Sequence, residues 1–176
     1  MRMTITAQTA IILTSAAILS AAACSNSQSA QAPAPAPAAA PASPAAPSYV
    51  PGLGEIMTLN QMRHTKLWFA GQAGNWGLAA YELEELHEGL DDAATFHPTH
   101  KDGTLLIPPL IDKIMKEPME QVEKAVNDKD AKAFPIAFDA LTAGCNSCHQ
   151  ATDFGINVVI RLTSNPYTNQ AFAPPK

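Results

Sequence analysis

A helical stripe of apolar residues that ends in two cysteines and a histidine constrains the fold of this chain most. Along residues 131–150, core-type side chains recur at steps of four, three, four and three, which is the spacing of one helix face. Asp130 is a suitable N-cap for this helix, and Pro135 is tolerated best in a first turn, so the helix should begin nearer Pro135 than Ala131. The stripe consists of Phe134, Phe138, Leu141, Cys145 and Cys148. The helix is therefore expected to point both cysteines toward a core.

The cysteines belong to the segment Cys145–His149, which has the form C-x-x-C-H. This form is the attachment site of a c-type haem. Two thiols three residues apart on one helical turn can each form a thioether to a vinyl group of one porphyrin, and the imidazole that follows can ligate the iron. The motif occurs once in the chain. We therefore predict one covalently attached haem c, with Cys145 and Cys148 as thioether sites and His149 as the proximal iron ligand.

Two other uses of a C-x-x-C pair agree less well with this sequence. A redox dithiol normally opens a helix that follows a strand, whereas this pair lies late in a helical pattern. A structural zinc site needs four ligands, and the chain has no second C-x-x-C. His97 and His100 could bind a metal, but no third ligand is near them in the sequence, so we expect them in a surface loop.

The beginning of the chain has the composition of an export signal followed by a linker. Residues 1–23 combine Arg2, an apolar stretch and a run of alanines, the pattern of a secretory signal peptide, and they are too short to favour a membrane span. Residues 24–51 are rich in alanine and proline, which predicts an extended spacer. Bacterial c-type haems resemble one another in being attached after export, so the signal agrees with the motif.

Cys24, the odd cysteine, directly follows the alanine run. The segment Leu19–Cys24 resembles a bacterial lipoprotein signal, in which the cysteine is acylated, although Ala21 stands where that family prefers leucine. We expect lipidation of Cys24 and a domain tethered to a membrane outside the cytoplasm, in the periplasm. The alternative is plain cleavage, which would leave a free thiol.

The rest of the chain, residues 52–176, is long enough for one domain with a single core. The whole chain has 11 Lys and Arg residues against 16 Asp and Glu residues, a net charge of −5. This acidic balance argues against a nucleic-acid partner and favours docking on basic or neutral proteins.

Hydrophobic periodicity predicts three further helices, over about 53–71, over about 76–90, and from residue 110 onward. Residues 91–109 are predicted to form a loop, and Pro118 is predicted to kink or restart the third helix. Four acidic residues of the second helix are expected on a solvated face: Glu82, Glu85, Glu88 and Asp92. Four amphipathic helices joined by moderate loops predict an all-α fold, a four-helix bundle with the haem on its last helix.

A haem motif on the last of four helices resembles the class II cytochromes c, which are the cytochrome c-prime group and its low-spin relatives. The resemblance covers about residues 53–150 and rests on helix order and on the segment Cys145–His149, because ordinary small cytochromes c carry the motif near the N-terminus. Class II relatives often form homodimers. The chain departs from them by continuing to Lys176, with an apolar run at 154–160 that we expect to pack over the haem edge or the bundle end. Arg161 would then reach a haem propionate or lie exposed.

The sixth iron ligand would come from the first helix, because its start lies beside the end of the fourth in an up-down-up-down bundle. Four side chains project from one side of that helix: Met57, Gln61, His64 and Trp68. Two of them are polar and would cost free energy on a core-facing stripe unless satisfied, which marks a candidate site. Met57 is the nearest match to the distal methionine of low-spin class II relatives, with ordinary core packing as its alternative. His64 is the rival ligand.

The sixth ligand separates the function classes. Met57 opposite His149 would give an iron of raised potential that is suited to electron transfer between redox partner proteins. Ligation by His64 would also give an electron carrier, generally of lower potential. A five-coordinate iron, as in the cytochrome c-prime group, would instead bind NO or CO, with Gln61 or His64 as donors. An enzyme such as a peroxidase would need a distal acid–base pair, which the adjacent Arg63 and His64 do not form because they face different ways.

Overall fold

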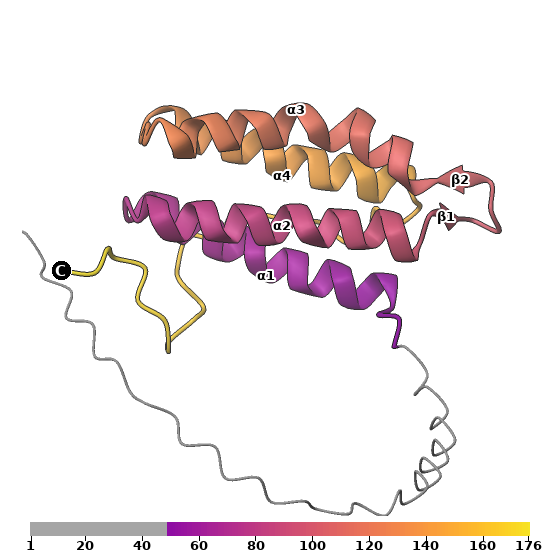
Figure 1. Cartoon of the computed structure of the whole chain (residues 1–176), viewed down its shortest axis with the longest axis horizontal. Helices are drawn as coiled ribbons and strands as arrows, with labels where there is room; N and C mark the ends of the chain where they lie inside the picture. The colour runs from indigo at the N-terminus through magenta and orange to yellow at the C-terminus, as the bar shows by residue number, and fades with distance from the viewer. Residues whose placement is uncertain (1–48) are drawn as a thin grey trace, which may run out of the picture. The chain divides into compact units, whose positions relative to one another are not determined.

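The computed structural model describes residues 49–176, so the predicted signal peptide, most of the predicted linker and Cys24 lie outside the described residues. The described chain forms four helices and one antiparallel hairpin of two short strands, in the order α1 (Leu53–Gln72), α2 (Trp76–Phe96), β1 (Thr99–His100), β2 (Leu105–Leu106), α3 (Ile107–Asn127) and α4 (Ala133–Ala151). The helices run up-down-up-down (Figure 1). The predicted all-α fold with four helices is confirmed. Within residues 49–176, none of the helices combines the length and the hydropathy that a membrane span requires.

The connection between α2 and α3 is shorter than predicted. Residues 91–96 continue α2 and residues 107–109 already belong to α3, so the predicted loop over 91–109 is wrong at both ends. Pro108 and Pro109 lie in the first turn of α3, where the missing amide donors have no intrahelical partner. The helix then continues through Pro118, so the predicted restart at that residue is wrong as well.

Asp130 directs the start of α4. Its Oδ1 accepts hydrogen bonds from the backbone N–H groups of Ala133 and Lys132, at 3.0 and 2.9 Å, and these bonds lower the pKa of the Asp130 carboxyl. The helix begins at Ala133, with Pro135 in its first turn as predicted. The capping bonds expected of Asp130 are therefore present, although the residue that directly precedes the helix is Lys132.

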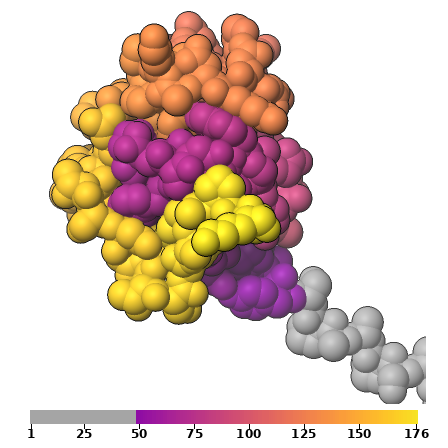
Figure 2. Space-filling view, turned by 90° about the vertical axis from the view of Figure 1, so that its left-hand side faces the viewer, coloured from indigo at the N-terminus to yellow at the C-terminus, as the bar shows by residue number. Residues whose placement is uncertain are grey.

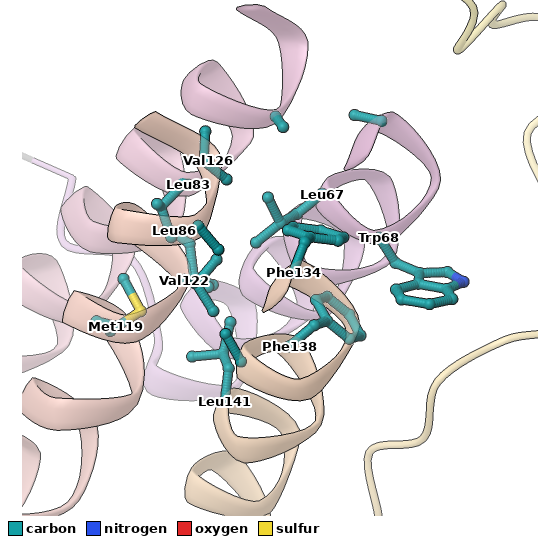
Figure 3. Packing of buried hydrophobic residues seen from close by; sticks show 14 of the residues in the cluster. Leu67, Trp68, Leu83, Leu86, Met119, Val122, Val126, Phe134, Phe138 and Leu141 are labelled. Atoms are coloured by element: carbon teal, nitrogen blue, oxygen red, sulfur yellow. The ribbon is translucent and has the colours of Figure 1, made fainter. Parts of the chain in front are cut away.

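The core lies between the inward faces of the four helices (Figure 3). Phe134, Phe138 and Leu141 of α4 are buried, as their spacing predicted. The ring of Trp68 on α1 lies 5.0 Å from that of Phe138, between centroids. Because the same stripe continues into Cys145, packing of these large side chains fixes the direction in which α4 presents its motif.

The polar face of α2 is only partly solvated. Glu82 is 3% exposed and faces α1, where Nζ of Lys66 lies 3.9 Å from its carboxylate. Burial raises the pKa of Glu82, and the charge of Lys66 partly opposes the shift. The expected solvated position is therefore wrong for Glu82, whereas Glu88 and Asp92 are exposed as predicted.

The chain beyond α4 forms a tail without helix or strand that returns along the bundle to the end where α1 meets α2 (Figure 1). Figure 2 shows its last residues lying across that end. Phe172 is buried there, with its ring centroid 5.7 Å from that of Phe69. Arg161 remains partly exposed, pairs with Asp139 at 3.0 Å and lies 4.6 Å from the ring centroid of Trp68. These contacts fasten the tail to both α1 and α4.

Candidate functional site

A cavity of about 470 Å³ opens between α1 and α4, near the end of the bundle that carries the hairpin. Its walls come from all four helices and from residues 154 and 156–159 of the tail. All six residues that the sequence predicted for the site line this one cavity: Met57, Gln61, His64, Cys145, Cys148 and His149. The structure therefore brings together side chains that are up to 92 positions apart in the sequence.

The contact between His64 and Thr142 shows which residues of α1 and α4 lie at the same level along the bundle axis. Nε2 of His64 on α1 lies 2.8 Å from Oγ1 of Thr142 on α4. Each helix rises about 1.5 Å per residue, and the two helices are antiparallel, so seven residues back along α1 match seven residues forward along α4. These steps lead to Met57 and His149. Met57 thus lies at about the level of His149, while His64 lies about 10 Å deeper in the bundle.

The imidazole of His149 is oriented by the tail. Its Nδ1 lies 2.6 Å from the backbone carbonyl oxygen of Asn157. A carbonyl oxygen only accepts hydrogen bonds, so Nδ1 carries the proton and Nε2 keeps a free lone pair. A hydrogen bond of this kind is what fixes the tautomer of a metal-ligating histidine. His149 is therefore prepared to donate through Nε2.

Asn146, between the two cysteines, holds the tail segment that supplies this carbonyl. Its Nδ2 donates to the carbonyl oxygen of Val159 at 2.9 Å, and its Oδ1 accepts from the N–H of Val159 at 2.8 Å. These two hydrogen bonds hold residues 157–159 against α4 at the segment Cys145–His149. No role of Asn146 was predicted from the sequence, although its polar side chain lies between two cysteines on a core-facing stripe.

The surroundings of the two thiols disfavour thiolate chemistry. Burial raises the pKa of Cys145 to about 12, with a smaller contribution from Cys148. Burial also raises the pKa of Cys148. Reactive dithiols and zinc-binding thiolates need the opposite shift. A neutral thioether at each sulfur suits these apolar walls better than a charged thiolate would.

Other histidines do not gather into a metal site. Nε2 of His97 lies 2.8 Å from the carbonyl oxygen of Pro51, and the ring of His100 packs on Phe154 at 5.2 Å between centroids. Within residues 49–176, no three His, Cys, Asp or Glu side chains come together in a metal-binding group.

His64 is held as a neutral, core-facing side chain. It is 2% exposed, its ring centroid lies 4.4 Å from that of Phe138, and burial lowers its pKa to about 4. Gln61, by contrast, is exposed at the rim of the cavity. Of the two polar residues predicted on the α1 stripe, only His64 is enclosed by the core.

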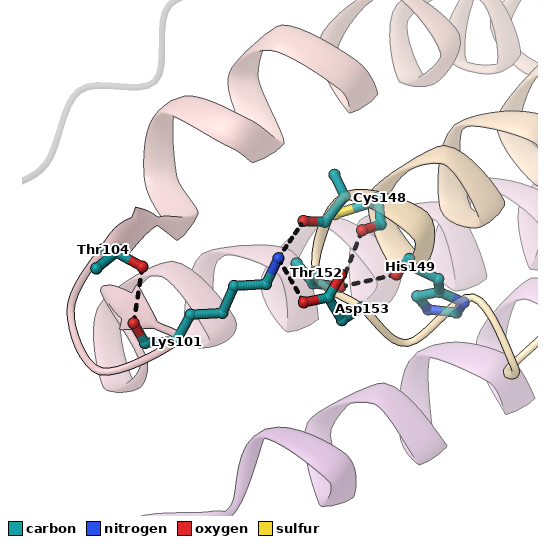
Figure 4. Close-up of polar contacts among 7 residues, drawn as sticks. Lys101, Thr104, Cys148, His149, Thr152 and Asp153 are labelled. Carbon is teal, nitrogen blue, oxygen red and sulfur yellow. Dashed lines mark hydrogen bonds and ion pairs between the residues drawn. The ribbon is translucent and has the colours of Figure 1, made fainter.

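The hairpin closes the end of α4, which the sequence analysis did not predict (Figure 4). Nζ of Lys101 lies 2.7 Å from the carboxylate of Asp153 and donates to the carbonyl oxygen of Ala151 at 3.2 Å. A positive charge at a helix C-terminus is favourable because the last carbonyl groups there have no intrahelical partner. Oγ1 of Thr152 donates to the carbonyl oxygen of Cys148 at 2.9 Å. The last turn, which carries Cys148 and His149, is therefore fixed from outside the helix.

No protein-family model, no curated protein and no solved structure matches this chain. Its activity must therefore be inferred from its own residues.

Proposed function

We propose that the protein is an exported monohaem cytochrome c of the class II kind, tethered to a membrane through an acylated Cys24, which carries electrons between redox partner proteins in the periplasm. Cys145 and Cys148 would form the thioethers, with His149 as proximal ligand and Met57 as distal ligand. The observation that carries the proposal is the imidazole of His149. Its Nδ1 is bound to the tail carbonyl, which leaves Nε2 free in a cavity that both cysteine side chains also line.

The residues of the cavity fit a haem in their chemistry. A volume of about 470 Å³ with mostly apolar walls is in the range of cofactor pockets. Two thiols on one helical turn provide the covalent attachment, and one neutral nitrogen donor follows them. The thioether of Met57 lies at about the level of His149 on the opposite wall. A bound haem iron would supply one-electron redox chemistry, with a potential raised by methionine–histidine ligation.

The protein residues would orient the group and keep water away from it. The tail carbonyl holds the His149 ring in one tautomer, and the Lys101 contacts fix the helix end that carries it. Apolar side chains from all four helices line the cavity and would shield one side of a bound group from solvent. The helices that form these walls pack on a buried core, and close-packed interiors change little in shape, which would suit a carrier whose ligands must stay in place in both oxidation states.

Met57 favours electron transfer over the binding of NO or CO. A five-coordinate carrier of such a gas needs an open position opposite the proximal histidine. In this chain a methionine side chain occupies the level of His149 on the facing wall, whereas His64 is deeper and bonded to Thr142. A Met57–His149 pair would therefore leave no open position.

The proposal is tested by expressing the full-length chain in a bacterium that attaches c-type haems and measuring the mass and optical spectrum of the product. We expect one covalent haem and a low-spin spectrum that carbon monoxide does not change. The double variant C145A/C148A should lose covalent haem, whereas the control Cys24→Ser should keep the haem and lose membrane attachment. Covalent haem in the double variant, or a high-spin ferric form that binds carbon monoxide when reduced, would contradict the proposal.

A further inference from the structure

The tail segment that orients His149 is hydrogen-bonded to α4 along one edge. The carbonyl oxygen of Asn157 accepts from Nδ1 of His149 at 2.6 Å. The N–H and the carbonyl oxygen of Val159 both bond to the side-chain amide of Asn146, at 2.8 and 2.9 Å. The N–H and the carbonyl of one residue point to the same side in an extended chain, as in a β-strand. Val159 is therefore extended, with these two groups directed toward α4.

The opposite edge of the segment, which we call the outer edge of residues 158–160, carries backbone groups that point away from α4. The peptide bonds of residues 49–176 are all trans, and a trans peptide directs its N–H and its C=O to opposite sides. The N–H of Val158 therefore points away from α4, opposite the carbonyl of Asn157. The carbonyl of Val158 and the N–H of Ile160 also point away, opposite the N–H and the carbonyl of Val159. The outer edge thus presents a donor, an acceptor and a donor in order.

The outer edge is exposed and unpaired. Within residues 49–176, no hydrogen bond engages the N–H or the carbonyl of Val158 or the N–H of Ile160. Val158 is 66% exposed and Ile160 is 62% exposed. Val158 also lines the cavity, whereas Ile160 lies outside its lining. Unpaired N–H and C=O groups beside exposed β-branched side chains are the features of a strand edge that pairs with another chain.

The order of the backbone groups determines which kind of ligand fits. A carboxylate, such as a haem propionate, would accept from the two N–H groups but would meet the carbonyl oxygen of Val158 between them. An ammonium group would donate to that oxygen but would meet a donor on either side. An extended peptide offers an acceptor, a donor and an acceptor at the matching spacing, and it pairs with such an edge by strand addition. The outer edge therefore favours a peptide over a small ion.

The charges around the edge determine what kind of peptide fits. Residues 154–160 contain no charged side chain. The charges that flank them are paired, Asp153 with Lys101 at 2.7 Å and Arg161 with Asp139 at 3.0 Å. The edge therefore complements an uncharged strand. A second copy of this chain fits less well, because each copy carries a net charge of −5 and like-charged copies repel.

We propose that the outer edge of residues 158–160 is a docking site for an extended, uncharged, apolar segment of another protein, which adds as a strand through backbone hydrogen bonds. The docked segment would lie beside the tail residues that orient His149. The site goes beyond the proposed function, because it consists of backbone groups and needs no haem. Its failure would leave the attachment test on Cys145 and Cys148 unaffected.

The experiment is amide hydrogen exchange of the purified full-length protein, resolved to single residues, with and without a blocked peptide of alternating threonine and valine. In the free protein we expect fast exchange at Val158 and Ile160 and slow exchange at Val159, whose N–H is bonded to Asn146. The peptide should slow exchange at Val158 and Ile160. The same peptide with every backbone nitrogen methylated should not, because it has no N–H to donate.

Two substitutions separate the backbone edge from its side chains. Ile160→Pro removes one outward N–H, and proline is compatible with the extended residue that precedes it. It should weaken peptide binding roughly tenfold, the effect of one lost hydrogen bond. Slow exchange at Val159 in this variant shows that the tail is still in place. Ile160→Ala keeps the N–H and is the matched control, which should weaken binding less.

Three results would overturn the proposal. Slow exchange at Val158 and Ile160 in the free protein at low concentration would mean that the protein itself covers the outer edge. Slow exchange that appears only at high protein concentration, together with a dimer in sedimentation, would assign the edge to a second copy. If the peptide gives no protection, or binds Ile160→Pro as tightly as Ile160→Ala, the outer edge does not dock a strand.

Discussion

At the scale of single residues, two histidines line one cavity, and a hydrogen bond holds a different ring nitrogen in each of them. The nitrogen that remains free decides what each histidine can bind. The tail carbonyl binds Nδ1 of His149 and leaves Nε2 free, as metal ligation requires. Thr142 binds Nε2 of His64 and leaves Nδ1 free, inside a core that keeps the ring neutral. Sequence spacing alone could not separate these two roles, because both residues fall on cavity-facing positions.

Replacement of Met57 tests the distal ligand. In Met57→Ala we expect the low-spin ferric spectrum to become high-spin and the reduced form to bind carbon monoxide, because the thioether donor opposite His149 is lost. Met62→Ala is the matched control, since Met62 lies on α1 without lining the cavity and should keep the low-spin spectrum. The optical spectra of both variants decide the point; an unaltered spectrum in Met57→Ala would exclude Met57 as the ligand.

The burial of His64 predicts how stability depends on pH. Burial lowers its pKa from the ordinary value of 6.5 in an unfolded chain to about 4 in the fold, so the unfolded state binds more protons between these values. This contribution to stability is fully present above about pH 6.5 and is lost as the pH falls toward 4, by roughly 3 kcal/mol in total. Urea unfolding at several pH values should show this slope, and His64→Phe should flatten it.

The control for this measurement is His87→Phe, because the side chain of His87 is exposed. It should leave the slope between pH 4 and 6.5 unchanged. A slope that persists in His64→Phe would assign the pH dependence to another group.

At the scale of helices, α1 and α2 approach each other where α2 lacks a side chain. A Cβ at Gly89 would overlap Oδ1 of Asn60 and lie 2.6 Å from a guanidinium nitrogen of Arg63. This glycine therefore lets one polar group, held by Arg63 and Glu85, pack between two helices. The sequence predicted both helices from their periodicity, but nothing in it indicated that Gly89 marks the close approach.

The close approach predicts a destabilising substitution. Gly89→Ala should lower the free energy of unfolding by about 1–3 kcal/mol, because Asn60 and Arg63 must shift to make room. Gly77→Ala, also in α2, meets nothing within 4 Å and should leave stability unchanged or raise it by less than about 1 kcal/mol. Thermal unfolding of the two variants compares their stability changes directly. Equal changes would mean that the close approach of α1 and α2 does not restrict the side chain at position 89.

Helix positions were more predictable than helix connections. The periodic burial of Phe134, Phe138 and Leu141 could be deduced from sequence because apolar spacing determines a helix face. The loop predicted over 91–109 was too long because the proline pair at 108–109 resembled a break, although a first helical turn accepts proline. The burial of Glu82 was not predicted because it depends on Lys66 of another helix.

At the scale of the whole molecule, two segments without helical periodicity complete the site. The tail supplies the carbonyl that orients His149, and the hairpin supplies the lysine that caps the same helix end. The two contacts differ in sequence separation, since Asn157 follows His149 by eight positions whereas Lys101 and Ala151 are 50 positions apart. The bundle thus provides the walls of the cavity, and the non-helical segments fix the orientation of the group that is expected to donate to iron.

Asn146 tests whether the tail has this role. Asn146→Ala removes both hydrogen bonds to Val159, which should lower the free energy of unfolding by about 1–2 kcal/mol and release residues 157–159 from α4. The carbonyl of Asn157 would then no longer hold Nδ1 of His149. We expect faster amide hydrogen exchange at Val159 and a changed reduction potential, because a hydrogen bond to a ligating histidine tunes the metal.

Ser147→Ala is the matched control, since Ser147 also lies between the two cysteines but is exposed, and its hydroxyl donates within α4 to Ala143. It should change stability by no more than about 0.5 kcal/mol and leave the potential unaltered. Loss of exchange protection at Val159 without any change in potential would show that the tail only covers the cavity. If both the exchange protection at Val159 and the reduction potential change, the tail controls the orientation of the His149 ring, although the tail lies outside the four helices.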